Sequence, residues 1–168
     1  MGSSETFENE LTQLLPRLRR FAHSLSRNSA DADDLTQSTV ERALRSRDQW
    51  LQGTRLDSWL YRIMRNLWID TARARTRRER HETGEEEAFA IGEDPRAAMD
   101  ASLELKRAME AMGRLPDEQR EVVALILIEG FGYREAAEML GLPIGTVSSR
   151  LVRGRNALLA MLGGPADG

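Results

Sequence analysis

The chain has 168 residues, contains no cysteine and carries a formal net charge of −3 at pH 7. This length suits one domain or two small ones, and the lack of cysteine excludes disulfides and thiolate metal sites and suits a reducing compartment. The two histidines, His23 and His81, are isolated in the sequence. We therefore expect no metal and no catalytic histidine. The longest apolar run, Val122–Ile128, is too short to span a membrane, and we expect neither a signal peptide nor membrane insertion.

The charges are unevenly distributed along the chain. Residues 1–80 hold 15 arginines and 11 acidic residues, a balance of +4. Residues 81–112 hold 3 basic and 9 acidic residues, and residues 113–168 hold 6 basic and 7 acidic residues. Nucleic-acid binding depends on local basic patches rather than on the total charge. The acidic net charge therefore does not exclude a nucleic-acid partner.

Apolar residues three or four positions apart predict a first helix over residues 7–25. Pro16 lies inside this pattern and predicts a kink, or a break between two helices. A second helix is predicted from residue 29 to about residue 48, with Ser29 as its N-cap.

Three aspartates, Asp31, Asp33 and Asp34, lie in the first turns of this second helix. They can complement the helix dipole and keep the surface solvated, or they can contact a partner with a basic surface. No histidine or third clustered ligand accompanies them, so they indicate neither metal binding nor acid–base catalysis.

Residues 50–57 predict a loop that bends at Gly53, followed by a helix over residues 59–75 with Asp57 or Ser58 as its cap. Arginines and aromatic residues are mixed in and after this helix, a combination that suits single-stranded or melted nucleic acid. The arginines are Arg62, Arg65, Arg73, Arg75, Arg77, Arg78 and Arg80, and the aromatic residues are Trp59, Tyr61 and Trp68. The alternative is that the tryptophans belong to the core and the arginines form a solvated face.

Residues 79–95 predict a flexible acidic linker, because seven of these seventeen residues are acidic and two glycines and a proline interrupt any helix. The linker either serves as a plain tether, screens the arginine cluster in a compact, self-masked chain, or lies along a basic channel of a partner. A helix follows over residues 96–113, and Pro116 with the acidic residues after it predicts another helix start. We assign Val122–Ile128 to this helix rather than to a buried strand.

Residues 132–159 predict a helix-turn-helix. Ala136, Ala137 and Leu140 form the apolar side of the first helix, and the Gly-Leu-Pro turn at 141–143 ends it. Hydroxyl and arginine residues cover the exposed side of the second helix. Such a surface suits the major groove of DNA, since short side chains allow close approach and arginine reaches phosphates or guanine edges. An ordinary helical hairpin with a basic face is the alternative.

Three stretches together resemble one family, the bacterial sigma factors of the extracytoplasmic-function group. They are DADDLTQ at 31–37, SWLYRIMRNLWID at 58–70, and LPDEQREVVAL at 115–125 with GYREAAEMLGLPIGTVSSRLVRGR at 132–155. The resemblance implies an all-α fold with two small helical domains, residues 5–80 and 97–162, joined by a flexible acidic linker at 81–96. The second domain contains the helix-turn-helix.

The resemblance also implies the site residues. Contacts to core RNA polymerase are expected at Asp31, Asp33, Asp34, Leu35 and Gln37. Contacts to the melted minus-ten element of the promoter are expected at Trp50, Gln52, Gly53, Thr54, Arg55, Leu56, Arg62, Arg65, Asn66 and Arg73. Contacts to the minus-thirty-five element are expected at Thr146, Ser148, Ser149, Arg150, Arg153 and Arg155. Ser148 and Leu56 depart from the residues usual in the family, a basic residue and an aromatic residue respectively, and this affects which promoter bases are read.

The expected partners are therefore core RNA polymerase, promoter DNA and an anti-sigma factor, in the bacterial cytoplasm or nucleoid. We expect no cofactor, no small-molecule substrate and no enzymatic activity of the chain itself. A stand-alone helix-turn-helix regulator is the main alternative, and it predicts tight duplex binding without polymerase, usually as a dimer. A helical module that binds only proteins is a third alternative, but it leaves the arginine cluster unexplained.

Overall fold

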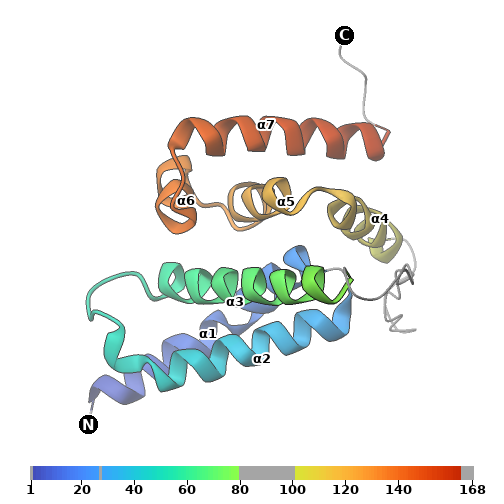
Figure 1. Ribbon diagram of the computed structural model, residues 1–168. Coiled ribbons are helices and arrows are strands. Elements are labelled where there is room, and N and C mark those ends of the chain that lie inside the picture. The colour runs from blue at the N-terminus through green and yellow to red at the C-terminus, as the bar shows by residue number, and fades with distance from the viewer. Residues whose placement is uncertain (1, 27, 80–100, 164–168) are drawn as a thin grey trace.

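The computed structural model describes residues 2–26, 28–79 and 101–163, and within these ranges the chain is helical with short connections and contains no strand (Figure 1). The predicted all-α class is thereby confirmed. The elements are α1 (Gly2–Leu25), α2 (Ser29–Arg45), a 3-10 turn η1 (Arg47–Gln49), α3 (Leu56–Glu79), α4 (Ala101–Arg114), α5 (Asp117–Val123), a π-helical turn η2 (Ala124–Ile128), α6 (Tyr133–Leu140) and α7 (Ile144–Met161).

The helices form two stacked groups, which we call the first half (α1–α3) and the second half (α4–α7) (Figure 1). The first half is a three-helix bundle in which α2 packs on both α1 and α3. In the second half, α5 and α6 both pack on α7. The two halves touch, because α1 contacts α4, α5 and η2 while α3 contacts α6. The predicted acidic linker lies outside the described residues.

The first half differs from the sequence prediction at several helix boundaries. Helix α1 begins at Gly2 and runs through Pro16 without a break, so the predicted division at this proline is wrong. The N-cap of α2 is Asn28 rather than Ser29, and its side-chain oxygen accepts the backbone N–H of Asp31 at 2.8 Å. Helix α2 ends at Arg45, and a 3-10 turn occupies the remainder of the predicted helix.

Helix α3 begins at Leu56, three residues before the predicted start, so neither Asp57 nor Ser58 is its cap. Asp57 instead lies in the first turn, where its carboxylate accepts the backbone N–H of Ser58 at 2.7 Å. Burial alone would raise the pKa of Asp57. The hydrogen bonds from Arg55 and from the Ser58 N–H outweigh this effect, and the pKa is lowered.

The predicted helix through Val122–Ile128 is confirmed, but its second part is wider than an α-helix. The backbone N–H of Glu129 donates to the carbonyl of Ala124 at 2.9 Å, the five-residue spacing of a π-helix. Such turns are often found at functional sites. This turn ends at Glu129, whose side chain contacts Arg20 of the first half.

The helix-turn-helix is confirmed as α6 and α7. Gly141 adopts φ 64°, the left-handed conformation that ends α6 and that glycine adopts without a steric penalty. Gly154 lies on the buried side of α7. A Cβ atom at this glycine would lie 2.7 Å from Cγ2 of Val123, so the close packing of α7 on α5 requires a residue without a side chain.

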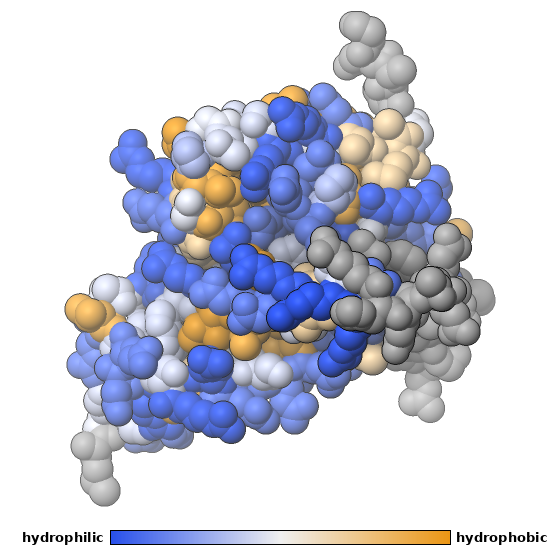
Figure 2. All heavy atoms as spheres, viewed as in Figure 1, coloured by the Kyte–Doolittle hydropathy of each residue, from blue (hydrophilic) through white to orange (hydrophobic). Residues whose placement is uncertain are grey.

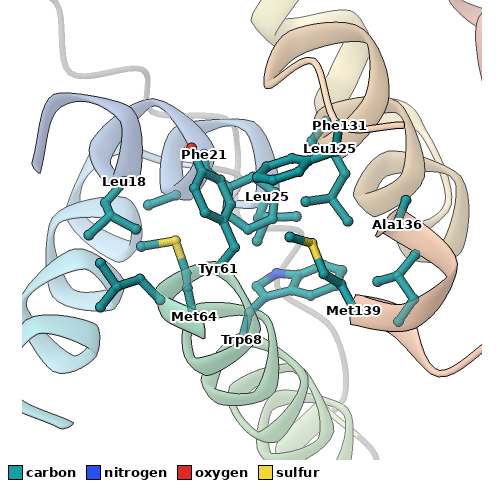
Figure 3. Packing of buried hydrophobic residues seen from close by; sticks show 14 of the residues in the cluster. Leu18, Phe21, Leu25, Tyr61, Met64, Trp68, Leu125, Phe131, Ala136 and Met139 are labelled. Carbon is teal, nitrogen blue, oxygen red and sulfur yellow. The ribbon is translucent and has the colours of Figure 1, made fainter. Parts of the chain in front are cut away.

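A single hydrophobic cluster extends through both halves. Figure 3 shows side chains of α1 and α3, among them Phe21, Tyr61 and Trp68, packed toward Phe131 and Met139 from the second half. The ring centroids of Phe21 and Tyr61 are 4.7 Å apart, and those of Tyr61 and Phe131 are 5.1 Å apart. The halves thus share one continuous core across their junction.

Candidate polymerase and nucleic-acid interfaces

The exposed face of α2 carries the residues expected to bind polymerase. Asp33, Asp34 and Gln37 are exposed, whereas Leu35 and Thr36 between them are buried. Leu35 is only 8% exposed and belongs to the core, so its side chain supports the helix from within. Asp31 is half-buried and forms an ion pair with Arg75 of α3 at 2.5 Å. The sequence stretch therefore divides into three exposed polar residues and two with structural contacts.

The loop between α2 and α3 lies beside a hollow of about 490 Å³ at the end of the first half. The residues that line the hollow are Ser3, Ser4, Phe7, Arg47, Asp48, Trp50 and Gln52. Trp50 is half-buried, its ring lies 5.6 Å from that of Phe7, and its indole N–H is enclosed without an acceptor among the described atoms. An aromatic ring beside a polar hollow fits the stacking of an unpaired base.

The other loop residues divide between solvent and core. Gln52, Gly53 and Thr54 are exposed, and Gly53 has φ 88°, so the tight bend depends on this glycine. Leu56 is 3% exposed and packs in the core. Arg55 is exposed, but its guanidinium is engaged by two carboxylates, that of Asp57 at 2.8 Å and that of Glu135 at 2.5 Å.

Helix α3 presents Arg62, Asn66 and Arg73 to solvent, and these residues recur at helical spacing on one side. Arg65 lies at the edge of this side, and its Nε atom donates to the carboxylate of Glu121 at 3.1 Å. Burial raises the pKa of Glu121, and the contact with Arg65 opposes this shift. Figure 2 shows a band of hydrophilic side chains along α3 on the viewed face, with apolar patches on either side.

The aromatic residues of α3 belong to the core rather than to a base-stacking surface. Tyr61 is 1% exposed and Trp68 is 9% exposed. Trp59 is half-buried and packs edge-on against Phe7, with 6.2 Å between the ring centroids. Of the alternatives left open by the sequence, core packing is therefore correct for these rings, and Trp50 is the aromatic residue placed beside the hollow.

Helix α7 presents a polar face away from its packing on α5. Arg153 and Arg155 are exposed, and Ser149 is exposed with its hydroxyl donating to the carbonyl of Thr146 at 3.1 Å. Thr146 and Ser148 are half-buried. Because Thr146, Ser149, Arg150 and Arg153 recur at spacings of three and four, they share one side of the helix, whereas Arg155 lies on another side.

Arg150 connects α7 to the groove between the two halves. Its guanidinium lies 3.7 Å from the carboxylate of Glu118 on α5. The groove has a volume of about 680 Å³, and the arginines among its lining residues are Arg65, Arg73, Arg77 and Arg150. One cleft thus brings together arginines expected at the minus-ten element with one expected at the minus-thirty-five element.

Sequence reasoning missed the charged contacts between the halves. The carboxylate of Glu129 accepts hydrogen bonds from Arg20 and Tyr61, and Arg17 lies within ion-pair distance. In the sequence these residues look like ordinary surface and core positions. Their spacing does not show which helices will contact each other. The unusually wide turn that directs Glu129 toward α1 also has no sequence signal.

Among the described residues, no three histidine, aspartate or glutamate side chains come together as a group that could hold a metal ion. None of the described helices is long and apolar enough to cross a membrane.

Comparisons with known proteins agree with this arrangement. Residues 11–78 match the family model for sigma-70 region 2, and residues 105–158 match that for sigma-70 region 4. The ECF RNA polymerase sigma factor EcfG of Rhodopseudomonas palustris is 37% identical over 162 residues, covering 96% of this chain and 88% of the relative. The ECF sigma factor SigM of Mycobacterium tuberculosis is 35% identical over 162 residues, covering 96% and 80%.

Two solved structures have similar folds. The sigma factor RpoE of Bartonella quintana, in complex with the anti-sigma factor NepR, superposes with a TM-score of 0.83 at 35% identity and covers 98% of this chain and 99% of that one. CnrH, in complex with the cytosolic domain of CnrY, superposes with a TM-score of 0.70 at 28% identity and covers 99% and 92%. Since relatives of this similarity match nearly end to end, the chain belongs to the ECF RNA polymerase sigma factors.

Proposed function

We propose that this sigma factor uses its first half to bind core RNA polymerase and the melted minus-ten element and its second half to read the minus-thirty-five element. The domain division is 5–80 and 97–162. The single observation that carries the proposal is that matches to region 2 and region 4 occur in one chain, in that order, over its two helical halves. A stand-alone helix-turn-helix regulator would need only the second of these.

The polymerase contact is assigned to the exposed face of α2. Asp33, Asp34 and Gln37 offer carboxylate and amide groups that suit a basic partner surface. Asp31 and Leu35 act behind this face, through the ion pair with Arg75 and through core packing respectively.

The minus-ten contact is assigned to the hollow at Trp50 and to the exposed side of α3. Extruding a base from the stack costs a few kcal/mol, so a receiving site must supply stacking and hydrogen bonds. Trp50 offers the stacking surface, and Arg62, Asn66 and Arg73 offer donors for phosphates and base edges. Gln52, Gly53, Thr54, Arg55 and Arg65 complete the proposed set of contacts, and Leu56 supports the loop from the core.

The minus-thirty-five contact is assigned to α7. In a helix-turn-helix, the second helix enters the major groove and its first residues reach the base edges. Thr146, Ser149, Arg150 and Arg153 share the side that would face the groove. Ser148 and Arg155 lie on another side of the helix and complete the proposed set.

Control by an anti-sigma factor is part of the proposal, since the similar sigma factor RpoE was solved in complex with the anti-sigma factor NepR. We also propose that the chain works in the cytoplasm, at the nucleoid when active, and that it catalyses no reaction itself. In this role it requires no cofactor, because binding and positioning are its whole contribution.

The test is transcription of a genomic promoter library by core RNA polymerase with and without the chain. We expect transcripts that start only when the chain is present and that share two spaced upstream motifs. Asp34→Arg should lower assembly with core enzyme, whereas Glu5→Arg, an equal charge reversal on exposed α1, should leave it unchanged. No new transcripts, together with tight duplex binding by the chain alone, would favour the stand-alone regulator.

A further inference from the structure

Leu51 lies in the loop between η1 and α3, and its side chain is directed to solvent instead of into the core. It is 72% exposed, more than any other large apolar residue that the described part of the chain presents to solvent, and it is not part of the hydrophobic cluster. The loop projects from the end of the first half (Figure 1). A single exposed leucine is common on protein surfaces. Leu51 differs from such a residue because its backbone is fixed and because its neighbour Trp50 lines the hollow.

The backbone of Leu51 is held by a tight turn over residues 51–54. Its carbonyl oxygen accepts the backbone N–H of Thr54 at 3.2 Å and the hydroxyl of the same threonine at 2.6 Å. Gly53, the third residue of the turn, has a φ of 88°, and a positive φ at this position is typical of a turn that favours glycine there. Two hydrogen bonds therefore fix the point from which the leucine side chain extends.

The residues on either side of Leu51 are anchored to α1. The ring of Trp50 lies 5.6 Å from that of Phe7, and the side-chain amide of Gln52 donates to the hydroxyl of Ser3. Trp50 and Gln52 both line the hollow, whereas Leu51 between them does not. The leucine is thus placed next to the hollow, on a loop that α1 holds from both sides of this residue.

Capture of an unpaired base creates a gap that an apolar side chain can fill. When a base leaves the duplex stack, its former neighbours lose their stacking contact. Proteins that deform a duplex insert leucine and other apolar side chains between base steps. A leucine in such a gap is also removed from water, whereas a short polar side chain gains little there. Gln52 and Thr54 are polar and Gly53 has no side chain, so within residues 51–54 only Leu51 suits this task.

We propose that Leu51 is a wedge for opening the minus-ten element: it enters the gap that an extruded base leaves in the duplex, while Trp50 receives that base in the hollow. This inference rests on the proposed assignment of the hollow to the minus-ten element. Leu51 is a positioning residue, since it holds the stack open and leaves the recognition of the base to its neighbours. Its contribution therefore belongs to the opening of paired DNA and is lost when the strands are already separate.

The test uses the full chain with core RNA polymerase and one promoter recovered from the library, prepared in two forms. In the paired form the strands are fully complementary, and in the premelted form mismatches keep the minus-ten region open. Leu51→Ser removes the apolar side chain, whereas Leu51→Met keeps an apolar side chain of similar size. Leu105→Ser is the matched control, the same replacement of a leucine that is 63% exposed on α4.

On the paired promoter, Leu51→Ser should lower the rate of transcription initiation about tenfold, because the gap loses its apolar filling. Leu51→Met and the control should stay within about twofold of the unaltered chain. On the premelted promoter, all of these proteins should agree within about twofold. A 2-aminopurine base in the minus-ten element, whose fluorescence rises on unstacking, should respond more slowly to Leu51→Ser on the paired form only. Assembly with core enzyme should be unchanged.

Equal initiation by Leu51→Ser and the unaltered chain on the paired promoter would overturn the wedge and leave the proposed function standing. An equal loss on both forms would also overturn it, because Leu51 would then contact the separated strand instead of opening the duplex. Weaker assembly of Leu51→Ser with core enzyme would overturn it in favour of a protein contact. If the unaltered chain started no transcripts on either form, the proposed function would fall and the wedge with it.

Discussion

The two surfaces that we propose to bind DNA differ in how far the chain itself covers them. On α7, Arg153 and Arg155 are exposed, one on either side of the packed Gly154. On the first half, Arg55 and Arg65 are paired with carboxylates of the second half. The helix proposed to read duplex DNA is therefore open on one side, whereas part of the surface proposed for the melted strand is in contact with the second half.

The difference follows from where each helix lies. Helix α7 packs on α5 and α6 and is at the outside of the molecule, so one side of it is free (Figure 1). Helix α3 lies at the junction, where Tyr61 and Trp68 fill the shared core and Arg65 pairs with Glu121 of α5.

The largest expected effect is a loss of folding stability when the buried Arg120 is replaced. Arg120 is 1% exposed and donates to four backbone carbonyls. The acceptors are Leu25 at 3.0 Å, Met112 at 2.8 Å, Gly113 at 3.1 Å and Leu115 at 2.7 Å. Arg120→Met would leave these carbonyls without this donor, and we expect a loss of about 3–5 kcal/mol in the free energy of unfolding.

Chemical denaturation monitored by circular dichroism measures this loss. Arg107→Met, at an exposed position of α4, is the control and should change the free energy of unfolding by less than about 0.5 kcal/mol. Equal stability of the two variants would contradict the central structural role of Arg120.

Two glycine substitutions in α7 test its packing on α5. Gly154→Ala places a Cβ atom 2.7 Å from Val123, so we expect a loss of about 1–3 kcal/mol in the free energy of unfolding. Gly145→Ala meets nothing within 4 Å in the same helix, and it should stabilise the fold by about 0.5–1 kcal/mol through helix propensity. Thermal unfolding of both variants tests the pair, and the same sign of change in both would be inconsistent with this packing.

The exposed side of α7 predicts that a substitution there weakens promoter binding without disturbing the fold. Arg153→Ala should weaken binding to duplex promoter DNA by about 1–3 kcal/mol and lower the salt dependence of binding, while assembly with core RNA polymerase stays unchanged. Fluorescence anisotropy at several salt concentrations measures the affinity. Arg114→Ala, at the exposed end of α4, is the control. Undiminished affinity of Arg153→Ala would remove this residue from the DNA surface.

The smallest expected effect is that of Glu121→Gln, because the burial cost of the carboxylate offsets its pairing with Arg65. We expect a change within about 1 kcal/mol in the free energy of unfolding at neutral pH. Since the pKa of Glu121 is raised, its contribution to stability is present below its ordinary pKa and is lost as the pH rises through the folded-state value.

Comparing the unaltered chain with Glu121→Gln across mildly acidic to neutral pH isolates this loss. Asp57, whose pKa is lowered, contributes with the opposite sign but does so in both proteins. A loss of several kcal/mol on substitution would instead mean that the pair with Arg65 is strongly stabilising.

Local features of the fold could be predicted from the sequence because they depend on neighbouring residues. The helix-turn-helix follows from the apolar spacing around Ala136 and from Gly141, whose left-handed conformation is observed. The errors were also local: Pro16 does not break α1, and Asn28 rather than Ser29 caps α2. In these cases tertiary packing or a neighbouring residue with a better hydrogen bond overrode the propensity.

The junction could not be predicted, because it depends on residues far apart in the chain. Arg20 and Glu129 are separated by 109 positions, and both read as ordinary charged residues. The exposed part of the candidate site, such as Arg153 and Asp34, could be proposed from the family resemblance. The pairing of Arg55 with Glu135 and of Arg65 with Glu121 could not. Sequence motifs identify which residues can bind DNA, and only the structure shows which of them are already engaged.

The most direct measurement of the central claim is transcription of the genomic promoter library by core RNA polymerase with and without the chain. We expect transcripts that start only when the chain is present and that share two spaced upstream motifs, one for each half. No such transcripts, together with tight duplex binding by the chain alone, would contradict the claim, because only the second half would then be needed.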